Sequence, residues 1–295
     1  MISQARTWIA AIADASRKLD QAGIADAKVN AEYLACNVLG FWNPSELRTS
    51  GDSFLTDEQN IQYDELISRR LSHEPLQHII GETEFFGLRL LTSSSALIPR
   101  PDTEILVEAA LKEASEMSRK HLQILDIGTG SGAIALAIAS KLPVSFVTGI
   151  DSSFEAIGLA IRNKKKLNIE NVSFEVMDIF HEDIAERFLE SVDILVSNPP
   201  YISIEEFGNL EKEVRDFDPR IALTDEGDGL SFYRRISGIG RRLLKEKGRI
   251  IVEVGYNAIL AVEKIFVNEG FTVIRKVKDL QGIERVLVTS CLSEN

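Results

Sequence analysis

Leu125-Asp126-Ile127-Gly128-Thr129-Gly130-Ser131-Gly132 is the stretch of sequence that decides the fold. It joins a short apolar run, 122–127, to a segment free of glycine and proline, 133–139. The run is typical of a buried strand and the segment of a helix. Strand, glycine turn and helix together begin a nucleotide-binding α/β unit, because glycines let a ligand approach the backbone and a helix N-terminus presents free N–H groups.

Acidic residues follow at the ends of the next two apolar runs. The run 144–150 ends in Asp151, which lies 151 − 130 = 21 residues past Gly130. This is near the spacing of about 20 expected for a carboxylate that binds a ribose. The run 172–176 leads to Asp178-Ile179, which is placed to flank an adenine. Both acids have an alternative interpretation as strand ends that face solvent.

The spacing of the glycines indicates which nucleoside is bound. It is Gly-x-Gly-x-Gly instead of the Gly-x-Gly-x-x-Gly of dinucleotide-binding folds. Asp126 also stands directly before the turn, where its negative charge would repel a pyrophosphate. A ligand with a cationic amino group, a sulfonium and no phosphate fits better. S-adenosylmethionine has this charge pattern.

A second motif, Asn198-Pro199-Pro200-Tyr201, follows the apolar run 192–196. Asn198 offers an amide oxygen as acceptor, and Pro199 has a fixed φ and a free carbonyl. The residue before a proline is held in extended geometry, so both acceptors are held stiffly. Beside the flat ring of Tyr201, such a pocket suits a planar group that bears an NH2, either an amide or an exocyclic amine. The alternative interpretation of Asn-Pro-Pro is a simple turn.

Taken together, the glycine loop, the acidic strand end and Asn-Pro-Pro-Tyr resemble the amino-methylating group of class I methyltransferases. Two further stretches, Ile98-Pro99-Arg100-Pro101-Asp102-Thr103-Glu104 and Pro75-Leu76-Gln77-His78-Ile79-Ile80-Gly81, narrow the resemblance. They are similar to the HemK/PrmC family, the release factor N5-glutamine methyltransferases. The resemblance covers nearly the whole chain, including a helical leader before Pro75.

In that family the Asn-Pro-Pro-Tyr pocket holds the glutamine of a Gly-Gly-Gln loop in a class 1 peptide chain release factor. The resemblance implies that Asn198, Pro199, Pro200 and Tyr201 bind this glutamine, and that Asn198, Pro199 and Tyr201 are catalytic. It also implies S-adenosylmethionine as the cofactor and S-adenosylhomocysteine as the product. The implied cofactor contacts are Asp126, Gly128, Thr129, Gly130, Ser131, Gly132, Asp151, Asp178, Ile179 and Asn198.

Three positions depart from the family pattern. His78 stands where a Tyr is common, and Asp218-Pro219 replaces a usual Glu-Pro. Asn257 follows Gly255-Tyr256 where a Gln is frequent. None of these falls in the glycine loop or in Asn-Pro-Pro-Tyr, so they bear on the shape of the substrate cleft and leave the reaction unchanged.

The net charge of the chain helps to distinguish the alternative functions. The chain has 33 Lys and Arg against 45 Asp and Glu, a formal net charge of −12. Phosphate backbones repel an acidic chain, and nucleic-acid binders usually have a basic face. This disfavours an adenine-N6 methyltransferase acting on DNA or RNA, which would use a similar pocket, and we expect no direct nucleic-acid binding. A non-catalytic cofactor-binding adaptor is the other alternative, and the complete set of site residues disfavours it.

Composition also predicts the cellular setting. No stretch approaches the ~18 unbroken apolar residues of a membrane span, and the N-terminus lacks the pattern of a signal peptide. The cysteines, Cys36 and Cys291, and the four histidines form no metal-binding spacing. We therefore expect a cytoplasmic protein with no membrane contact, reduced cysteines and no metal.

The expected fold is α/β: a class I (Rossmann-like) methyltransferase domain with a seven-stranded sheet, preceded by a small helical N-terminal domain and a β-hairpin linker. We assign 1–74 to the helical domain, which we expect to recognise the substrate, 75–99 to the linker with a turn at 92–95, and 100–295 to the methyltransferase domain. The expected strands lie near 122–127, 144–150, 172–177, 192–197, 249–254, 271–277 and 284–290, and the last two pair antiparallel.

Overall fold

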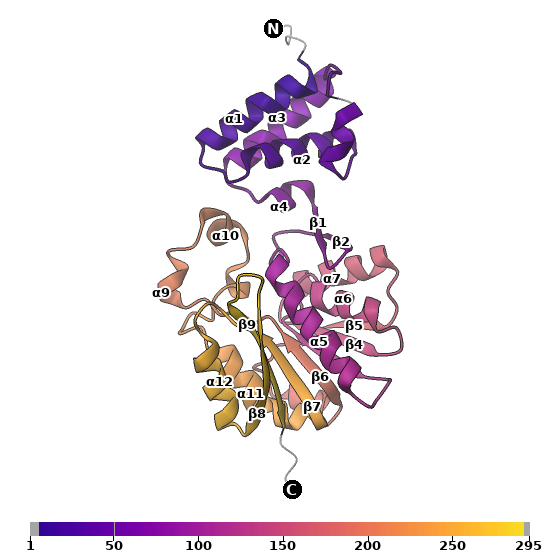
Figure 1. Ribbon diagram of the computed structural model, residues 1–295, viewed down its shortest axis with the longest axis vertical. Helices are drawn as coiled ribbons and strands as arrows, with labels where there is room; N and C mark the ends of the chain where they lie inside the picture. Colours follow the sequence, from indigo (N-terminus) through magenta and orange to yellow (C-terminus); the bar gives the residue numbers. More distant parts are fainter. Residues whose placement is uncertain (1–5, 50, 292–295) are drawn as a thin grey trace. The chain divides into compact units, whose positions relative to one another are not determined.

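The computed structural model describes residues 6–49 and 51–291 (Figure 1). The chain divides into two compact units. One consists of Met1–Gly81 with Lys212–Phe217, and we call it the leader unit. The other consists of Glu82–Glu211 with Asp218–Asn295, and we call it the sheet unit. No helix within the described ranges is both long enough and apolar enough to cross a membrane.

The leader unit is helical, as expected. Its elements are α1 (Trp8–Gln21), α2 (Ala27–Leu39), the 3-10 helix η1 (Pro44–Thr49), α3 (Asp57–Leu71), α4 (Leu76–Ile80) and α10 (Lys212–Phe217). A capping box begins α3, because Thr56 Oγ1 accepts from the Gln59 backbone N–H and the Gln59 side chain accepts from Thr56 N–H. At the centre, the ring of Trp8 meets Tyr63 edge-on at 5.5 Å.

Arg70 joins α10 to the rest of the leader unit. Its side chain is buried, its Nε donates to Asn30 Oδ1 at 2.7 Å, and its Nη1 donates to the Glu74 carbonyl at 3.0 Å. Its Nη2 forms an ion pair with Glu213 of α10. A buried guanidinium is costly to hold without acceptors, so this pairing fixes α10 to α3.

The sheet unit contains a seven-stranded sheet in the order β5-β4-β3-β6-β7-β9-β8. The predicted seven strands are confirmed: β3 (Gln123–Ile127), β4 (Phe146–Asp151), β5 (Val172–Val176), β6 (Val192–Ser197), β7 (Leu244–Glu253), β8 (Phe271–Lys278) and β9 (Glu284–Cys291). The first five run parallel, and β9 pairs antiparallel with both β7 and β8. Chain order reverses at β3, which places the carboxyl ends of β3, β4 and β6 together.

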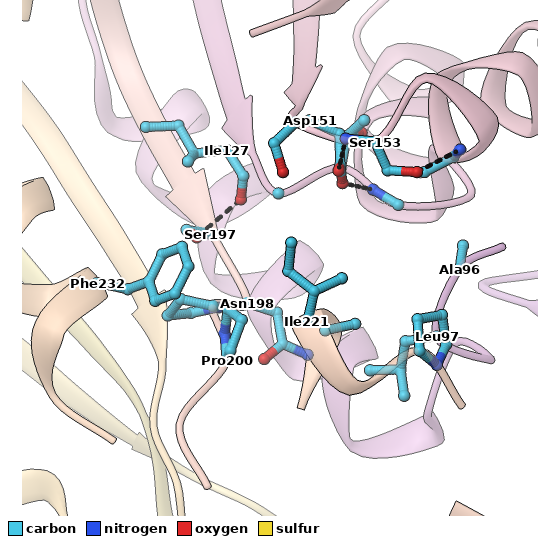
Figure 2. Close-up of a pocket in the computed structure, with 18 of the residues that line it drawn as sticks. Ala96, Leu97, Ile127, Asp151, Ser153, Ser197, Asn198, Pro200, Ile221 and Phe232 are labelled. Carbon is cyan, nitrogen blue, oxygen red and sulfur yellow. Dashed lines mark hydrogen bonds between the residues drawn. The ribbon is translucent and has the colours of Figure 1, made fainter. Parts of the chain in front are cut away.

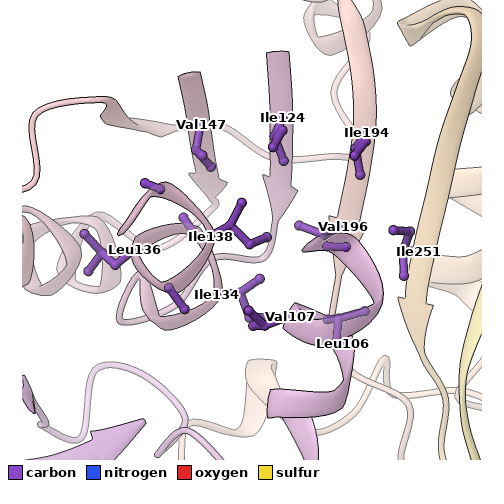
Figure 3. Packing of buried hydrophobic residues seen from close by; sticks show 14 of the residues in the cluster. Leu106, Val107, Ile124, Ile134, Leu136, Ile138, Val147, Ile194, Val196 and Ile251 are labelled. Atoms are coloured by element: carbon purple, nitrogen blue, oxygen red, sulfur yellow. The ribbon is translucent and has the colours of Figure 1, made fainter. Parts of the chain in front are cut away.

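Helices cover both faces of the sheet. The covering helices are α5 (Glu104–Glu116), α6 (Ala133–Lys141), α7 (Phe154–Leu167), α8 (Asp183–Arg187), α11 (Ser231–Leu243) and α12 (Ile259–Asn268). The short elements η2 (Pro101–Thr103), α9 (Ile204–Phe207) and η3 (Arg220–Ala222) lie in the connecting segments. Alternate strand residues serve opposite faces. Ile124 belongs to the cluster that includes Leu106 of α5 and Ile134 of α6 (Figure 3). Its neighbour Leu125 packs in the other cluster, which includes buried residues of α8, α11 and α12.

The hairpin ahead of the sheet has its turn elsewhere than predicted. Strands β1 (Glu82–Phe85) and β2 (Leu88–Leu91) pair antiparallel, so the turn is Phe86-Gly87 and the prediction of a turn at 92–95 was wrong. Both turn residues have positive φ, 52° and 74°, as a two-residue hairpin turn of the primed type requires. Gly87 was the local signal, and the serine-rich stretch 92–95 instead leads toward the site.

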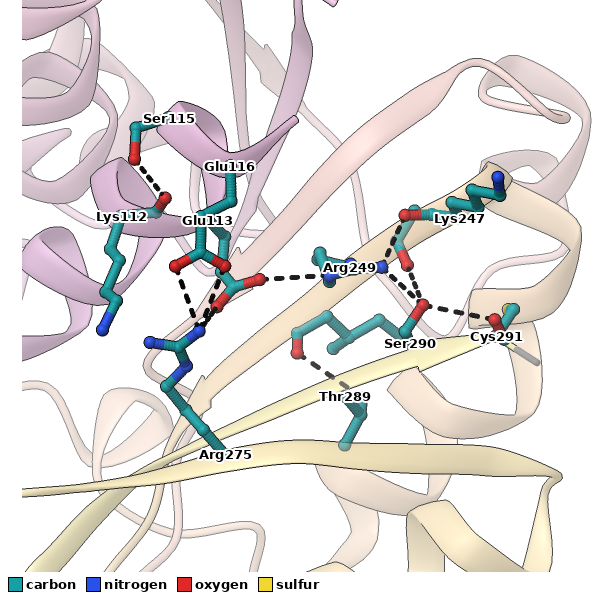
Figure 4. Close-up of polar contacts among 12 residues, drawn as sticks. Lys112, Glu113, Ser115, Glu116, Lys247, Arg249, Arg275, Thr289, Ser290 and Cys291 are labelled. Carbon is teal, nitrogen blue, oxygen red and sulfur yellow. Dashed lines mark hydrogen bonds and ion pairs between the residues drawn. The ribbon is translucent and has the colours of Figure 1, made fainter. Parts of the chain in front are cut away.

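A buried acid ties α5 to the far strands of the sheet (Figure 4). Glu113 is 1% exposed and forms ion pairs of 3.1 Å with Arg249 of β7 and with Arg275 of β8. Arg275 also pairs with Glu116 at 3.2 Å. The cluster fixes the C-terminal half of α5 against β7 and β8, at the end of the helix remote from the cavity.

Candidate active site

A cavity of about 580 Å³ opens at the carboxyl ends of β3, β4 and β6, within the sheet unit (Figure 2). Ligand sites of open α/β sheets lie at this edge, and the volume falls within the ~300–1,000 Å³ typical of small-molecule sites. Ten of the sequence-predicted site residues line it: Gly128, Thr129, Gly130, Ser131, Asp151, Asp178, Ile179, Asn198, Pro199 and Pro200. Asp126, Gly132 and Tyr201 do not.

The glycine loop is held on β4. The backbone N–H groups of Gly128 and Thr129 both donate to the Ile150 carbonyl at 2.9 Å. All three glycines of the motif have positive φ. Gly132 also packs closely, since a Cβ there would lie 2.8 Å from the Phe174 ring. It therefore supports the loop from beneath, toward β5, and does not face the cavity.

Asp151 organises the loop and retains capacity for a ligand. Its Oδ2 accepts from Gly130 N–H and its Oδ1 from Ser153 N–H, each at 2.9 Å. Burial raises the pKa of the Asp151 carboxyl, and these backbone hydrogen bonds oppose the rise. A carboxylate offers about four lone-pair positions, so acceptor sites remain for a pair of hydroxyl groups in the cavity.

Asp126 lies below the loop and is fully buried. Its Oδ2 accepts from the Thr129 hydroxyl at 2.6 Å. Burial raises the pKa of Asp126 to about 7, the bond from Thr129 opposes this, and the nearby Asp151 adds to it. Because Asp126 is screened by its own loop, its charge can act on a ligand only through Thr129 and across the loop backbone.

The Asn-Pro-Pro stretch faces the glycine loop across the cavity (Figure 2). Ser197 at the end of β6 donates to the Ile127 carbonyl at 2.8 Å, which joins β6 to β3 directly below the site. Asn198 donates from Nδ2 to the Thr103 hydroxyl at 3.1 Å. The amide NH2 is therefore committed to a neighbour, and the amide oxygen is left for a ligand.

Tyr201 supports this stretch from outside the cavity. Its ring packs against Gly255, where an added Cβ would lie 2.8 Å from Tyr201 Cδ2. Burial raises the pKa of the Tyr201 phenol to about 12. The ring thus braces the Asn-Pro-Pro segment against the end of β7 instead of forming part of the cavity wall.

Other segments complete the walls of the cavity, and the sequence motifs did not predict that they would line it. Arg100 and Leu97 come from the stretch before α5, and Ile221 projects into the cavity from η3 although its side chain is 61% exposed. Arg100 forms an ion pair of 2.7 Å with Asp218, which fastens these two loops together at the wall. The stretch 98–104 carried a family signal, but nothing in it indicated that partner 118 residues away.

The cavity lining combines distinct chemistries. Ile134, Ala156 and Ile179 add apolar side chains to the same lining that includes Asp151 and Asn198. Phe180 and Phe232 add an edge-to-face aromatic pair at 5.1 Å. Across the described ranges, no three His, Cys, Asp or Glu side chains converge as metal ligands would. The arrangement can hold a nucleoside at one end and a planar amide or amine at the other.

Comparison with known proteins matches two families to separate parts of the chain. Residues 10–81 match the family described as PrmC N-terminal domain, and residues 118–282 match a methyltransferase domain family. The release factor glutamine methyltransferase of Fusobacterium nucleatum subsp. nucleatum is 41% identical over 271 residues, covering 92% of this chain and 75% of the relative. That of Thermodesulfovibrio yellowstonii is 40% identical over 258 residues, covering 88% and 90%. A solved structure, the release factor-specific protein-(glutamine-N5) methyltransferase of Alicyclobacillus acidocaldarius, is 33% identical with a TM-score of 0.42, covering 66% of this chain and 95% of that one.

Proposed function

Since this chain belongs to the release factor glutamine methyltransferases, we infer that it methylates the side-chain amide nitrogen (N5) of a glutamine in a peptide chain release factor, within the Gly-Gly-Gln motif. The observation that carries the proposal is that one cavity brings together the glycine loop, Asp151 and Asn198. The identity of about 40% to named relatives extends over most of the chain. We further propose that it works in the cytoplasm, where release factors act.

The cavity fits S-adenosylmethionine as the cofactor. Asp151 has spare acceptor capacity for ribose hydroxyls, and Asp178 with Ile179 would flank the adenine. The glycine loop leaves room for the methionine part, because a Cβ at Gly128 would meet nothing and one at Gly130 would meet only Ala96, at 3.7 Å. When bound, this cofactor supplies a methyl group on a positively charged sulfur.

The protein's contribution is to hold the amide nitrogen in line with that methyl group. An amide nitrogen is a poor nucleophile because its lone pair is delocalised into the carbonyl. Asn198 Oδ1 and the Pro199 carbonyl would each accept one amide hydrogen of the glutamine. These bonds orient the nitrogen and stabilise the positive charge that grows on it in the transition state. On gaining the methyl group the amide nitrogen would become acidic, and it would release one of the hydrogens that Asn198 Oδ1 and the Pro199 carbonyl hold.

The glutamine lies on a protein loop, so recognition needs more than this cavity. Stable protein recognition usually buries about 1,200–2,000 Å² in total, which one peptide loop does not supply. None of the residues lining the cavity comes from 1–81. We propose that the leader unit contacts the folded release factor, while the sheet unit carries out the chemistry.

The test is methylation with labelled S-adenosylmethionine. The purified chain is incubated with a folded class 1 release factor, with the same factor carrying Gln→Ala in Gly-Gly-Gln, and with DNA and RNA. We expect label in the first sample alone, at a single glutamine located by mass spectrometry. Label in nucleic acid with none in the release factor would replace this proposal with the adenine-N6 reaction. Binding of the cofactor with no transfer to any substrate would support an adaptor.

A further inference from the structure

Glu253 is a buried acid behind the amide pocket. It is the last residue of β7, is 5% exposed and does not line the cavity. Within the part of the chain that the structure describes, its Oε2 has no hydrogen-bond partner. Burying an acceptor without a partner costs free energy, so such a group requires an explanation.

The register of the sheet brings Glu253 beside Asn198. Strands β6 and β7 are parallel and pair Ser197 with Val252, so the next residues, Asn198 and Glu253, leave the two strand ends side by side. Thr103, directly before α5, lies at the same position, and its hydroxyl oxygen accepts a hydrogen bond from Asn198 Nδ2 at 3.1 Å. Thr commonly caps a helix with its hydroxyl, but the Thr103 side chain makes no cap bond to α5. The hydroxyl is directed toward the site instead.

Counting hydrogens determines the direction of this chain of contacts. The Asn198 NH2 can only donate, so Thr103 Oγ1 accepts from it. The single hydroxyl hydrogen of Thr103 must then go to another acceptor, and the acceptor that faces it is the Glu253 carboxylate, whose pKa the side chains of Thr103 and Asn198 both lower. An ionised carboxylate only accepts, which fixes the hydroxyl, and the hydroxyl fixes the amide. Oδ1 of Asn198 is thereby turned away from Thr103.

We propose that Glu253 is a positioning residue for the methylation reaction, acting through Thr103 to hold the Asn198 amide with its oxygen toward the substrate. The inference rests on the proposed function, because it assigns a purpose to the orientation of Asn198. Reversal of this amide would present its NH2 to the NH2 of the glutamine, and two donors repel. The carboxylate does not touch the substrate, so its effect falls on turnover and leaves cofactor binding unchanged.

The ionisation of Glu253 makes the device sensitive to pH. Burial raises the pKa of this carboxyl to about 7, while Thr103, Arg285 and Asn198 lower it. The charged and titratable groups that face it are Asp102 (η2), which raises its pKa, Tyr201 (after β6), Tyr233 (α11), and Arg285 (β9). Above about pH 7 the carboxylate accepts and holds the chain of contacts in one direction. Below that pH it is protonated and can donate, so the direction is lost.

The decisive variant is Glu253→Gln, which keeps the shape and removes the charge. We expect kcat to fall about 10- to 100-fold, the scale of a small misplacement of a reacting group, with the Kd for S-adenosylmethionine within about two-fold of wild type. Wild-type kcat should rise with pH through about 7, and this rise should be absent in Glu253→Gln. The matched control is Glu113→Gln, an equally buried acid remote from the cavity, which should leave kcat per folded molecule unchanged.

Thr103 provides the second arm of the experiment. Thr103→Val should reduce kcat as Glu253→Gln does, Thr103→Ser should lose less because it keeps the hydroxyl, and the Thr103→Val/Glu253→Gln double variant should lose little more than either single one. Full additivity, or wild-type kcat and pH dependence in folded Glu253→Gln, overturns the proposal. A wild-type protein that does not methylate release factors would instead remove the proposed function itself, which separates the two failures.

Discussion

At the residue scale, the site depends on acceptors that are held in place before any ligand arrives. Asn198 commits its NH2 to Thr103, and Asp151 commits part of each carboxylate oxygen to the backbone. Each side chain therefore has one orientation, and its remaining acceptor positions are aimed by those bonds. Such preorganisation avoids the cost of reorienting dipoles during the reaction.

Asn198→Ala removes the amide acceptor. We expect kcat to fall by about 10²–10³, the usual cost of losing one transition-state hydrogen bond, while the Kd of S-adenosylmethionine changes only a few-fold. Single-turnover methylation of a release factor, with calorimetry of cofactor binding, measures both. Near wild-type turnover in this variant would remove Asn198 from the mechanism.

Asp151→Ala should affect the binding of S-adenosylmethionine instead of the glutamine. It removes the acceptor for ribose hydroxyls and also the hydrogen bond that anchors Gly130. The binding free energy of S-adenosylmethionine should therefore weaken by about 1.5–3 kcal/mol, which raises its Kd. The rate at saturating cofactor should change less. Calorimetry at fixed pH checks the affinity, and an unchanged Kd would show that Asp151 only shapes the loop.

The buried carboxyl of Glu253 also makes the unfolding free energy of the protein depend on pH. Its pKa is raised from 4.5 to about 7 by burial, so the folded state binds the proton more tightly than the unfolded state. Its ionisation penalty is absent below about pH 4.5 and complete above about pH 7. The unfolding free energy of Glu253→Gln minus that of wild type should therefore increase as the pH rises between these limits, by up to roughly 3 kcal/mol, because only the wild type loses stability there. Denaturant titrations at both ends check the sign, and a constant difference would contradict the raised pKa.

At the element scale, α11 contains a pair of glycines that test how closely helices pack on the sheet. Gly238 is exposed, and a Cβ there would meet nothing within 4 Å. Gly240 is buried, and its Cβ would lie 2.5 Å from Ile250 Cδ1 and 3.1 Å from the Phe271 ring. The same substitution two positions apart thus meets open water in one case and the core in the other.

We expect Gly238→Ala to stabilise the protein by about 0.5–1 kcal/mol, because alanine favours the helix. Gly240→Ala should destabilise it by about 1–3 kcal/mol, because the core must shift to admit a methyl group. Urea denaturation of both variants gives the comparison. Equal effects would mean that α11 does not pack on β7 and β8 as described.

The elements differ in how well the sequence predicts them. Strands, glycine turn and Asn-Pro-Pro all follow local signals, such as apolar periodicity and fixed backbone geometry, and the seven strands were predicted correctly. The hairpin turn was misplaced because the polar stretch 92–95 outweighed Gly87, whose positive φ marks the turn. Local spacing also identifies a strand end without determining which side chains face the cavity. Tyr201 and Asp126 turn away from it, and only tertiary packing decides that.

At the scale of the whole molecule, the association of α10 with the leader unit has no local sequence signal. Arg70 and Glu213 are 143 residues apart, and each looks like an ordinary surface charge in the sequence. Long-range pairs of this kind set the boundaries of the units. Leu76, Ile79 and Ile80 likewise pack in the leader core, which continues to Gly81.

A truncation that removes residues 1–81 should therefore begin at Glu82, because the buried core of the leader unit ends before that residue. We expect residues 82–295 to bind S-adenosylmethionine, since the cavity lies wholly within them. The kcat/KM on a folded release factor should fall strongly, whereas that on a short Gly-Gly-Gln peptide should change little. Equal kcat/KM of full-length and truncated protein on the folded factor, with thermal melts showing an intact fold, would leave the leader as a stability element.

The α10 pairing also imposes an order on biosynthesis. A nascent chain emerges N-terminus first at ~5–20 residues per second, so the 143 residues between Arg70 and Glu213 take roughly 7–30 s to make. Throughout that interval the leader unit lacks its last helix, and Arg70 has amide and carbonyl acceptors without a carboxylate. The leader unit is thus completed only after Phe217, the last residue of its second segment, has been made.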